Sequence, residues 1–125
     1  MEKLKFINEK MEQIGVPYEF GLWTSEIKYP YFVGEITEEP TSTEDGLEQS
    51  TMLLTGFTRG NYSDLETVKK KIKSHFPSFY GFRGQTDSGS SIAVFFDGSF
   101  YVPTGEADLK KIQINLKIKE WKGAV

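Results

Sequence analysis

The first stretch of the chain carries apolar residues at helical spacing. They recur every three or four positions, at Leu4, Ile7, Met11 and Ile14. This spacing places them on one face of an amphipathic helix. Gly15 suits the left-handed position that follows a helix, and Pro17 prevents its continuation. The pattern therefore predicts a helix that ends at about residue 14.

A second helix is predicted after residue 62. Ser63 and Glu66 have the spacing of a capping box, in which each side chain accepts a hydrogen bond from the other residue's backbone. The apolar positions then follow at helical spacing: Leu65, Val68, Ile72 and Phe76. Pro77 stops the helix, and the outward positions carry lysines: Lys69, Lys70, Lys71 and Lys73.

The remaining apolar runs alternate with polar residues or are rich in aromatic and β-branched residues, which is typical of strands. We predict strands over Tyr31–Ile36, Thr51–Arg59, Ser91–Phe96, Ser99–Val102 and Ile112–Ile118. Asp97-Gly98 is a strong hairpin signal between two of them. Tyr18–Leu22 is expected to be a strand or an extended connection, and a further strand is expected around Phe79–Thr86.

The order of these elements is α-β-β-α-β-β-β, which is typical of an α+β fold. We expect two helices packed on one face of a mainly antiparallel, or mixed, sheet of about four to six strands. A chain of 125 residues has the usual size of one domain, and it has neither an internal repeat nor a linker. We therefore expect a single domain over residues 1–125.

Composition removes several classes of function. The chain has no cysteine, which excludes a disulfide scaffold, a thiol nucleophile and a zinc–thiolate site. The first residues alternate charged and apolar side chains, unlike a signal peptide, and no apolar run is long enough to span a bilayer. We expect a soluble protein made in the cytoplasm, with no membrane partner.

Charge is unevenly distributed along the chain. Residues 1–62 hold 11 acids and 5 bases, for a net charge of −6, whereas residues 63–125 hold 7 acids and 10 bases, for +3. The two halves are complementary, and the contacts can lie inside the fold or between copies. The overall charge of −3 argues weakly against a dedicated nucleic-acid binder. The lysines also lack aromatic residues interleaved at the same spacing, as a single-strand stacking surface would have.

The residues that usually carry chemistry are sparse. His75 is the one histidine, and its place at a helix end favours an electrostatic cap over a catalytic role. The glycine-rich segments around Gly84 and Gly89 match no phosphate-binding loop. We expect no enzymatic activity, no cofactor and no bound metal.

An acidic segment, Thr37–Gln49, joins the first two long strands. With Glu35 just before it, it holds six carboxylates, without the spacing of a calcium-binding loop: Glu35, Glu38, Glu39, Glu44, Asp45 and Glu48. A solvated loop and a contact with another protein both explain such a segment better than a catalytic or metal site does.

The order of elements and several short stretches resemble one known family. An N-terminal helix precedes YPYFVGEI, then a charged loop, a strand ending TGFTRG, the helix SDLETVKKKIKSHF and late antiparallel strands. This layout resembles the tail-terminator, or tail-completion, proteins of long-tailed bacteriophages and prophages over about residues 1–122. The segment Gly84–Ser91 does not align with that pattern.

The resemblance implies a structural role in virion assembly, first in the host cytoplasm and then in the virion tail. Such proteins form homo-oligomeric rings, commonly hexamers, that terminate the tail tube and contact tail-tube and head-completion proteins. No sequence-specific nucleic-acid contact is expected.

Within such a ring, the acids of the 38–48 loop are expected to meet lysines of the second helix or the last strand of the adjacent copy. The residues of this subunit interface are Glu38, Glu39, Glu44, Asp45, Glu48, Lys69, Lys70, Lys73, Lys117 and Lys119. The alternative is a small ligand- or peptide-binding module with an aromatic-lined pocket built from Tyr18, Phe20, Trp23, Tyr31 and Tyr80.

Overall fold

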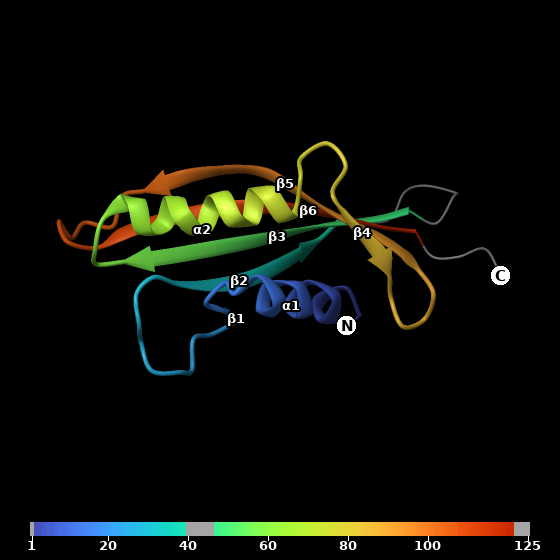
Figure 1. The fold of residues 1–125 in the computed structure, drawn as a ribbon, viewed down its shortest axis with the longest axis horizontal. Coiled ribbons are helices and arrows are strands. Elements are labelled where there is room, and N and C mark those ends of the chain that lie inside the picture. Colours follow the sequence, from blue (N-terminus) through green and yellow to red (C-terminus); the bar gives the residue numbers. More distant parts are fainter. Residues whose placement is uncertain (1, 40–46, 122–125) are drawn as a thin grey trace.

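The computed structural model describes residues 2–39 and 47–121 (Figure 1). Two helices and six strands make an α+β fold with a mixed, curled sheet. The helices are α1 (Glu2–Ile14) and α2 (Tyr62–His75). The strands are β1 (Tyr18–Phe20), β2 (Tyr31–Glu38), β3 (Leu47–Thr58), β4 (Phe82–Gln85), β5 (Ser91–Val102) and β6 (Lys110–Trp121).

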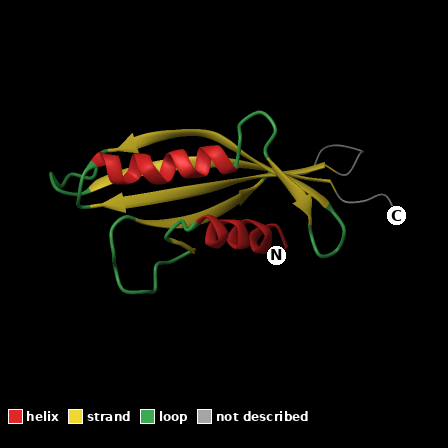
Figure 2. Ribbon diagram, in the orientation of Figure 1, coloured by secondary structure: helices red, strands yellow, loops and turns green. Residues whose placement is uncertain are grey.

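The sheet has the strand order β1-β2-β3-β6-β5-β4 (Figure 2). Only β1 and β2 pair in parallel, and the other neighbours are antiparallel. The two central strands pair along their whole length, from Leu47 opposite Trp121 to Thr58 opposite Lys110. Because β1 has 3 residues and β4 has 4, both edges of the sheet are short.

The core follows the alternation of the central strands. In β3 and β6, every second side chain is buried, including Leu54 and Ile114 at 0% exposure. The apolar side chains among them belong to one hydrophobic cluster that also contains Ile7 and Met11 of α1 and Leu65 of α2. The alternate positions, such as Phe57, are only half-buried. The apolar spacing of both predicted helices is therefore confirmed as core packing.

The expected hairpin at Asp97-Gly98 is wrong. Strand β5 is continuous, and the register with β6 shifts between Phe96 and Ser99, which makes a β-bulge. Gly98 has φ 105, a conformation that glycine adopts without a Cβ clash. Because β6 is long enough to pair on both sides of the bulge, Asp97-Gly98 bends one strand and does not reverse the chain.

The start of α2 also differs from the predicted capping box. Asn61 is the N-cap, and Asp64, three residues later, accepts a hydrogen bond from the Asn61 backbone N–H at 3.1 Å. Glu66 instead accepts from Lys69 and from the Tyr101 hydroxyl. The helix begins one residue earlier than Ser63 because Asn61 and Asp64 satisfy the cap.

The last strand, β6, lies between β3 and β5 in the interior of the sheet. Its lysines therefore do not protect a sheet edge. Lys117 and Lys119 instead occupy the half-buried side of a central strand. Among the described residues, no helix combines the length and apolar character needed to cross a membrane.

Candidate functional site: an acidic cluster and a basic aromatic pocket

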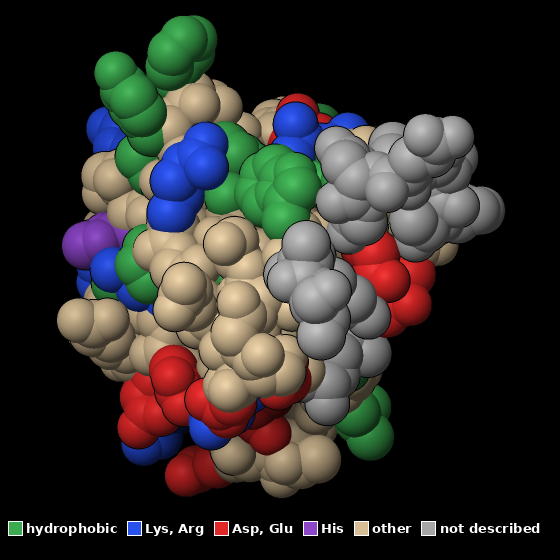
Figure 3. All heavy atoms as spheres, turned by 90° about the vertical axis from the view of Figure 1, so that its right-hand side faces the viewer, with side chains coloured by type: hydrophobic (Ala, Val, Ile, Leu, Met, Phe, Trp, Pro, Cys, Tyr) green, Lys and Arg blue, Asp and Glu red, His purple; other side chains and the backbone are tan. Residues whose placement is uncertain are grey.

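Carboxylates from four separate elements meet at the end of the molecule where α1 begins. A pocket of about 420 Å³ is lined by Glu2, Lys3, Glu38, Glu48, Ser88, Ser90 and Glu120. We call Glu2, Glu38, Glu48 and Glu120 the acidic cluster. Figure 3 views this end and shows Asp and Glu side chains gathered on the lower part of its surface. The pairing of β3 with β6 creates part of the cluster, because Glu48 lies directly opposite Glu120.

Lys3 compensates part of this negative charge. Its side chain is 9% exposed, and its Nζ lies 3.0 Å from the Glu38 carboxylate. At the same end, a hydrogen bond from Ser88 lowers the pKa of Glu2, so this carboxylate is held in its charged form. Four carboxylates and one lysine are among the side chains that line the pocket.

Two of the five predicted acidic contacts lie in this cluster. Glu38 and Glu48 line the pocket, and Glu39 is exposed just beyond β2, where its backbone N–H bonds to the Gln49 carbonyl at 3.0 Å. Glu44 and Asp45 lie outside the described residues. Sequence reasoning missed Glu2 and Glu120, because only the pairing of the sheet brings them to this end.

Three of the five predicted basic contacts gather at a second pocket, of about 480 Å³. Its lining consists of Lys73, Ser78, Phe79, Phe95, Phe96, Asp97, Gly98, Lys117 and Lys119. We call this the basic pocket. The Nζ atoms of Lys73 and Lys119 each lie 5.7 Å from a ring centroid, that of Phe96 and Phe95 respectively. Such contacts hold the two cations over aromatic rings without neutralising them.

Lys69 and Lys70 do not line the basic pocket. Lys69 donates to Glu66 at 2.8 Å within its own helix, and Lys70 is exposed on the same helix. The structure thus brings Lys73, Lys117 and Lys119 together and leaves the other two predicted lysines outside the group.

An exposed aromatic pair stands beside the basic pocket. Phe79 and Tyr80 are 86% and 71% exposed, and their rings meet edge to face with centroids 5.4 Å apart. The loop that carries them is fixed at both ends. The Gly81 N–H bonds to the Pro77 carbonyl at 2.8 Å, and Arg83 Nε donates to the Tyr80 carbonyl at 2.8 Å. The sequence signal for this pair is two aromatic residues between the helix-stopping Pro77 and Gly81.

The predicted aromatic pocket is only partly assembled. Trp23 and Tyr31 are in ring contact, at 4.9 Å between centroids, and Tyr31 also stacks on Phe57. Tyr18 lines one pocket with Phe20, between α1 and β1, and another pocket with Trp23. Tyr80 belongs to the exposed pair described above, next to β4 at the other edge of the sheet order. The five residues therefore do not form one site.

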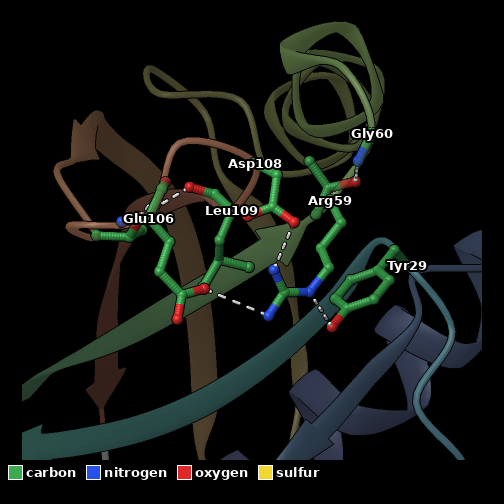
Figure 4. A network of polar contacts seen from close by, with 8 residues as sticks. Tyr29, Arg59, Gly60, Glu106, Asp108 and Leu109 are labelled. Carbon is green, nitrogen blue, oxygen red and sulfur yellow. Dashed lines mark hydrogen bonds and ion pairs between the residues drawn. The ribbon is translucent and has the colours of Figure 1, made fainter.

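Arg59, just after β3, connects Tyr29 with the loop between β5 and β6 (Figure 4). Its guanidinium donates to Asp108 at 2.9 Å, to Glu106 at 3.3 Å and to the Tyr29 hydroxyl at 3.2 Å. The hydrogen bonds with Tyr29 and Asp108 raise the pKa of Arg59 above its usual value. Because its donors already face acceptors, Arg59 is a structural contact and not a free anion site.

No group of three or more potential metal ligands is found in residues 2–39 and 47–121. His75 is the last residue of α2 and is exposed, a position that suits the predicted interaction with the helix end. The arrangement of charged and aromatic side chains is suited to binding another surface.

Comparison with models of known protein families gave no match, and a search of characterised proteins gave none either.

Proposed function

We propose that this protein is a structural assembly protein of a long-tailed phage or prophage. In this proposal, copies form a ring that terminates the tail tube and joins it to the head, through contacts with tail-tube and head-completion proteins. The element order and the YPYFVGEI and TGFTRG stretches support the proposal through their resemblance to tail-terminator proteins.

One observation carries the proposal: the acids and bases expected to meet between copies occupy separate places on one chain. Glu38 and Glu48 belong to the acidic cluster, and Lys117 and Lys119 to the basic pocket. None of these residues lines both pockets. A ring needs two different and complementary patches on each copy, because each subunit contacts its two neighbours differently. Opposite charge on the two patches steers their encounter and fixes their register.

We also propose that both helices pack on the same face of the sheet. Residues of both helices share one core cluster with the buried side of β3 and β6, which supports it. The opposite side, with Phe57 and Lys117 half-buried, is then free for contacts within the assembly.

Sedimentation velocity and negative-stain imaging of the full chain test the proposal. In low salt we expect a closed species of several times the mass of one chain, visible as rings. It should weaken in high salt, because the Debye length falls from about 10 Å at 0.1 M to about 3 Å at 1 M. A monomer at every protein and salt concentration would overturn the proposal.

Charge reversal at the basic pocket tests its mechanism. Lys117→Glu combined with Lys119→Glu should raise the concentration needed for assembly at least tenfold, because the pocket would then repel the acidic cluster. Lys70→Glu combined with Lys71→Glu is the matched control, since both lysines are exposed outside the pocket and the change in charge is the same. An equal effect of both changes would show that total charge, and not this pocket, drives assembly.

A second candidate function is the binding of a ligand or peptide beside β1. A pocket of about 660 Å³ there is lined in part by Tyr18, Trp23 and Tyr29, and aromatic walls suit such ligands. Saturable quenching of Trp23 fluorescence by an added peptide, with Trp121 replaced by Phe, would favour this function. Absence of quenching by aromatic peptides would count against it.

A further inference from the structure

We propose that the aromatic pair Phe79–Tyr80 of one copy inserts into the pocket between α1 and β1 of the next copy. This inference rests on the proposed ring assembly and names the contact that anchors it. The pair projects from the loop that precedes β4, whereas the pocket lies beside β1.

The positions of the two features fit a head-to-tail contact. β1 and β4 are the first and last strands in the order of the sheet. In Figure 1, the loop between α2 and β4 lies at the top and β1 lies at the lower edge of the sheet. A contact between two different patches at opposite edges joins every copy to the next one in the same way. When the rotation from one copy to the next divides a full turn, the copies close into a ring.

The receiving pocket has the size and apolar surface for an aromatic side chain. Its volume is about 460 Å³, which is within the range of pockets that bury compact ligands. Apolar lining comes from Val16, Tyr18, Phe20 and Leu22. Leu22 is 73% exposed and Phe20 38%, so apolar surface is left for a neighbour to cover.

The polar groups of the two patches are complementary. The lining of the pocket includes Glu12, Glu19 and Asn8, and the Oδ1 atom of Asn8 is buried without a hydrogen-bond partner among the described residues. A buried acceptor without a donor is destabilising, so a donor from a neighbouring copy would be favourable here. The incoming patch supplies donors in the Tyr80 hydroxyl and the Arg83 guanidinium, which stands next to the pair.

Area and preorganisation make the aromatic pair suitable as an anchor. Aromatic side chains bury about 150–250 Å² each, so the pair supplies about 300–500 Å². A stable interface buries roughly 800 Å² on each partner, so the adjoining basic pocket must supply much of the rest. Because hydrogen bonds from Gly81 and Arg83 already fix the loop, little ordering is needed on association.

Disulfide cross-linking tests the contact directly, since the chain has no cysteine of its own. A variant with both Tyr80→Cys and Leu22→Cys should give a ladder of covalent oligomers on mild oxidation. An equimolar mixture of the two single variants should stop at a heterodimer. The control pairs Tyr80→Cys with Phe100→Cys, because Phe100 is also exposed but lies on β5, outside the receiving pocket.

Cross-linking no greater than in the control overturns this inference. If the cysteine-free chain nevertheless sediments as a ring, the proposed function stands and another contact closes the ring. If the chain is also monomeric at every concentration, the proposed function fails with it. A ladder confined to the Tyr80–Leu22 pair supports both.

Discussion

At the residue scale, Gly56 of β3 leaves space in the core for a side chain from the neighbouring strand. Gly56 lies directly opposite Phe32 of β2, and the Phe32 ring covers the place where a side chain would stand. A Cβ at Gly56 would lie 2.2 Å from the ring atom Cε2, far inside van der Waals contact. The strand pattern TMLLTGFTR predicted the strand but could not show that its glycine leaves space for a ring from a neighbouring strand.

Replacement of Gly56 by Ala should therefore lower the free energy of unfolding by about 1–3 kcal/mol, the usual cost of overpacking. Chemical denaturation of the purified variant measures this change. In a Phe32→Leu background the same substitution should cost less, because the ring that clashes is gone. An equal cost in both backgrounds would contradict the proposed clash.

A second residue-scale feature is the carboxylate of Glu19, which holds the segment after β1. It accepts hydrogen bonds from the Thr24 hydroxyl at 2.7 Å and from the backbone N–H groups of Thr24 and Ser25 at 3.2 Å. The Thr24 hydroxyl is the largest cause of a lowered pKa for Glu19. Because the folded pKa lies below the unfolded one, this contact stabilises the segment above about pH 4.3 and is lost as pH falls through the folded pKa.

A carboxyl NMR titration should therefore place the pKa of Glu19 below about 4.3. Thr24→Val removes the hydroxyl donor and keeps the side-chain size, so it should raise this pKa toward the ordinary value. An unchanged titration in the Thr24→Val variant would show that the hydrogen bond does not stabilise the charged form.

At the element scale, the start of α2 depends on Asp64. Its carboxylate accepts from the Asn61 backbone N–H and from the Thr58 hydroxyl, so it joins the end of β3 to the helix. Asp64→Ala should cost about 1 kcal/mol of stability, as the loss of a cap does. Ser63→Ala is the matched control and should change stability by less than about 0.5 kcal/mol. The reverse order of effects, measured by thermal denaturation, would restore Ser63 as the cap.

The helices and strands show how much of the fold the spacing of apolar residues can predict. Spacing of apolar residues predicted both helices and the strands around Tyr31–Ile36 and Ile112–Ile118, because burial of one face imposes that spacing. It failed at Asp97-Gly98, where β5 continues, and it did not show that β6 lies inside the sheet. Both depend on which strand pairs with which, and turn propensity carries no information on that pairing.

At the scale of the whole molecule, the candidate site is a product of topology. The sequence predicted an acidic and a basic group, with Glu38, Lys73, Lys117 and Lys119 among their members. Only the fold adds Glu120 to the acids. It also sets Phe79 beside the lysines, because the loop after α2 packs against the bulge of β5. Contacts between residues far apart in the chain could not be derived from spacing alone.

The central claim is that two different, oppositely charged patches join neighbouring copies. A mixing experiment by sedimentation velocity tests it most directly. One variant reverses the basic pocket, with Lys117→Glu and Lys119→Glu, and the other reverses the acidic cluster, with Glu2→Lys and Glu38→Lys. Circular dichroism first verifies that both are folded.

Each variant alone should sediment as a smaller species than the wild type under the same low-salt conditions. Their equimolar mixture should recover larger assemblies in which the two variants alternate. Each junction then joins either two unchanged patches or two reversed patches, and both combinations bring opposite charges together. A mixture that sediments no faster than the separate variants, or a wild type that remains monomeric, would contradict the account.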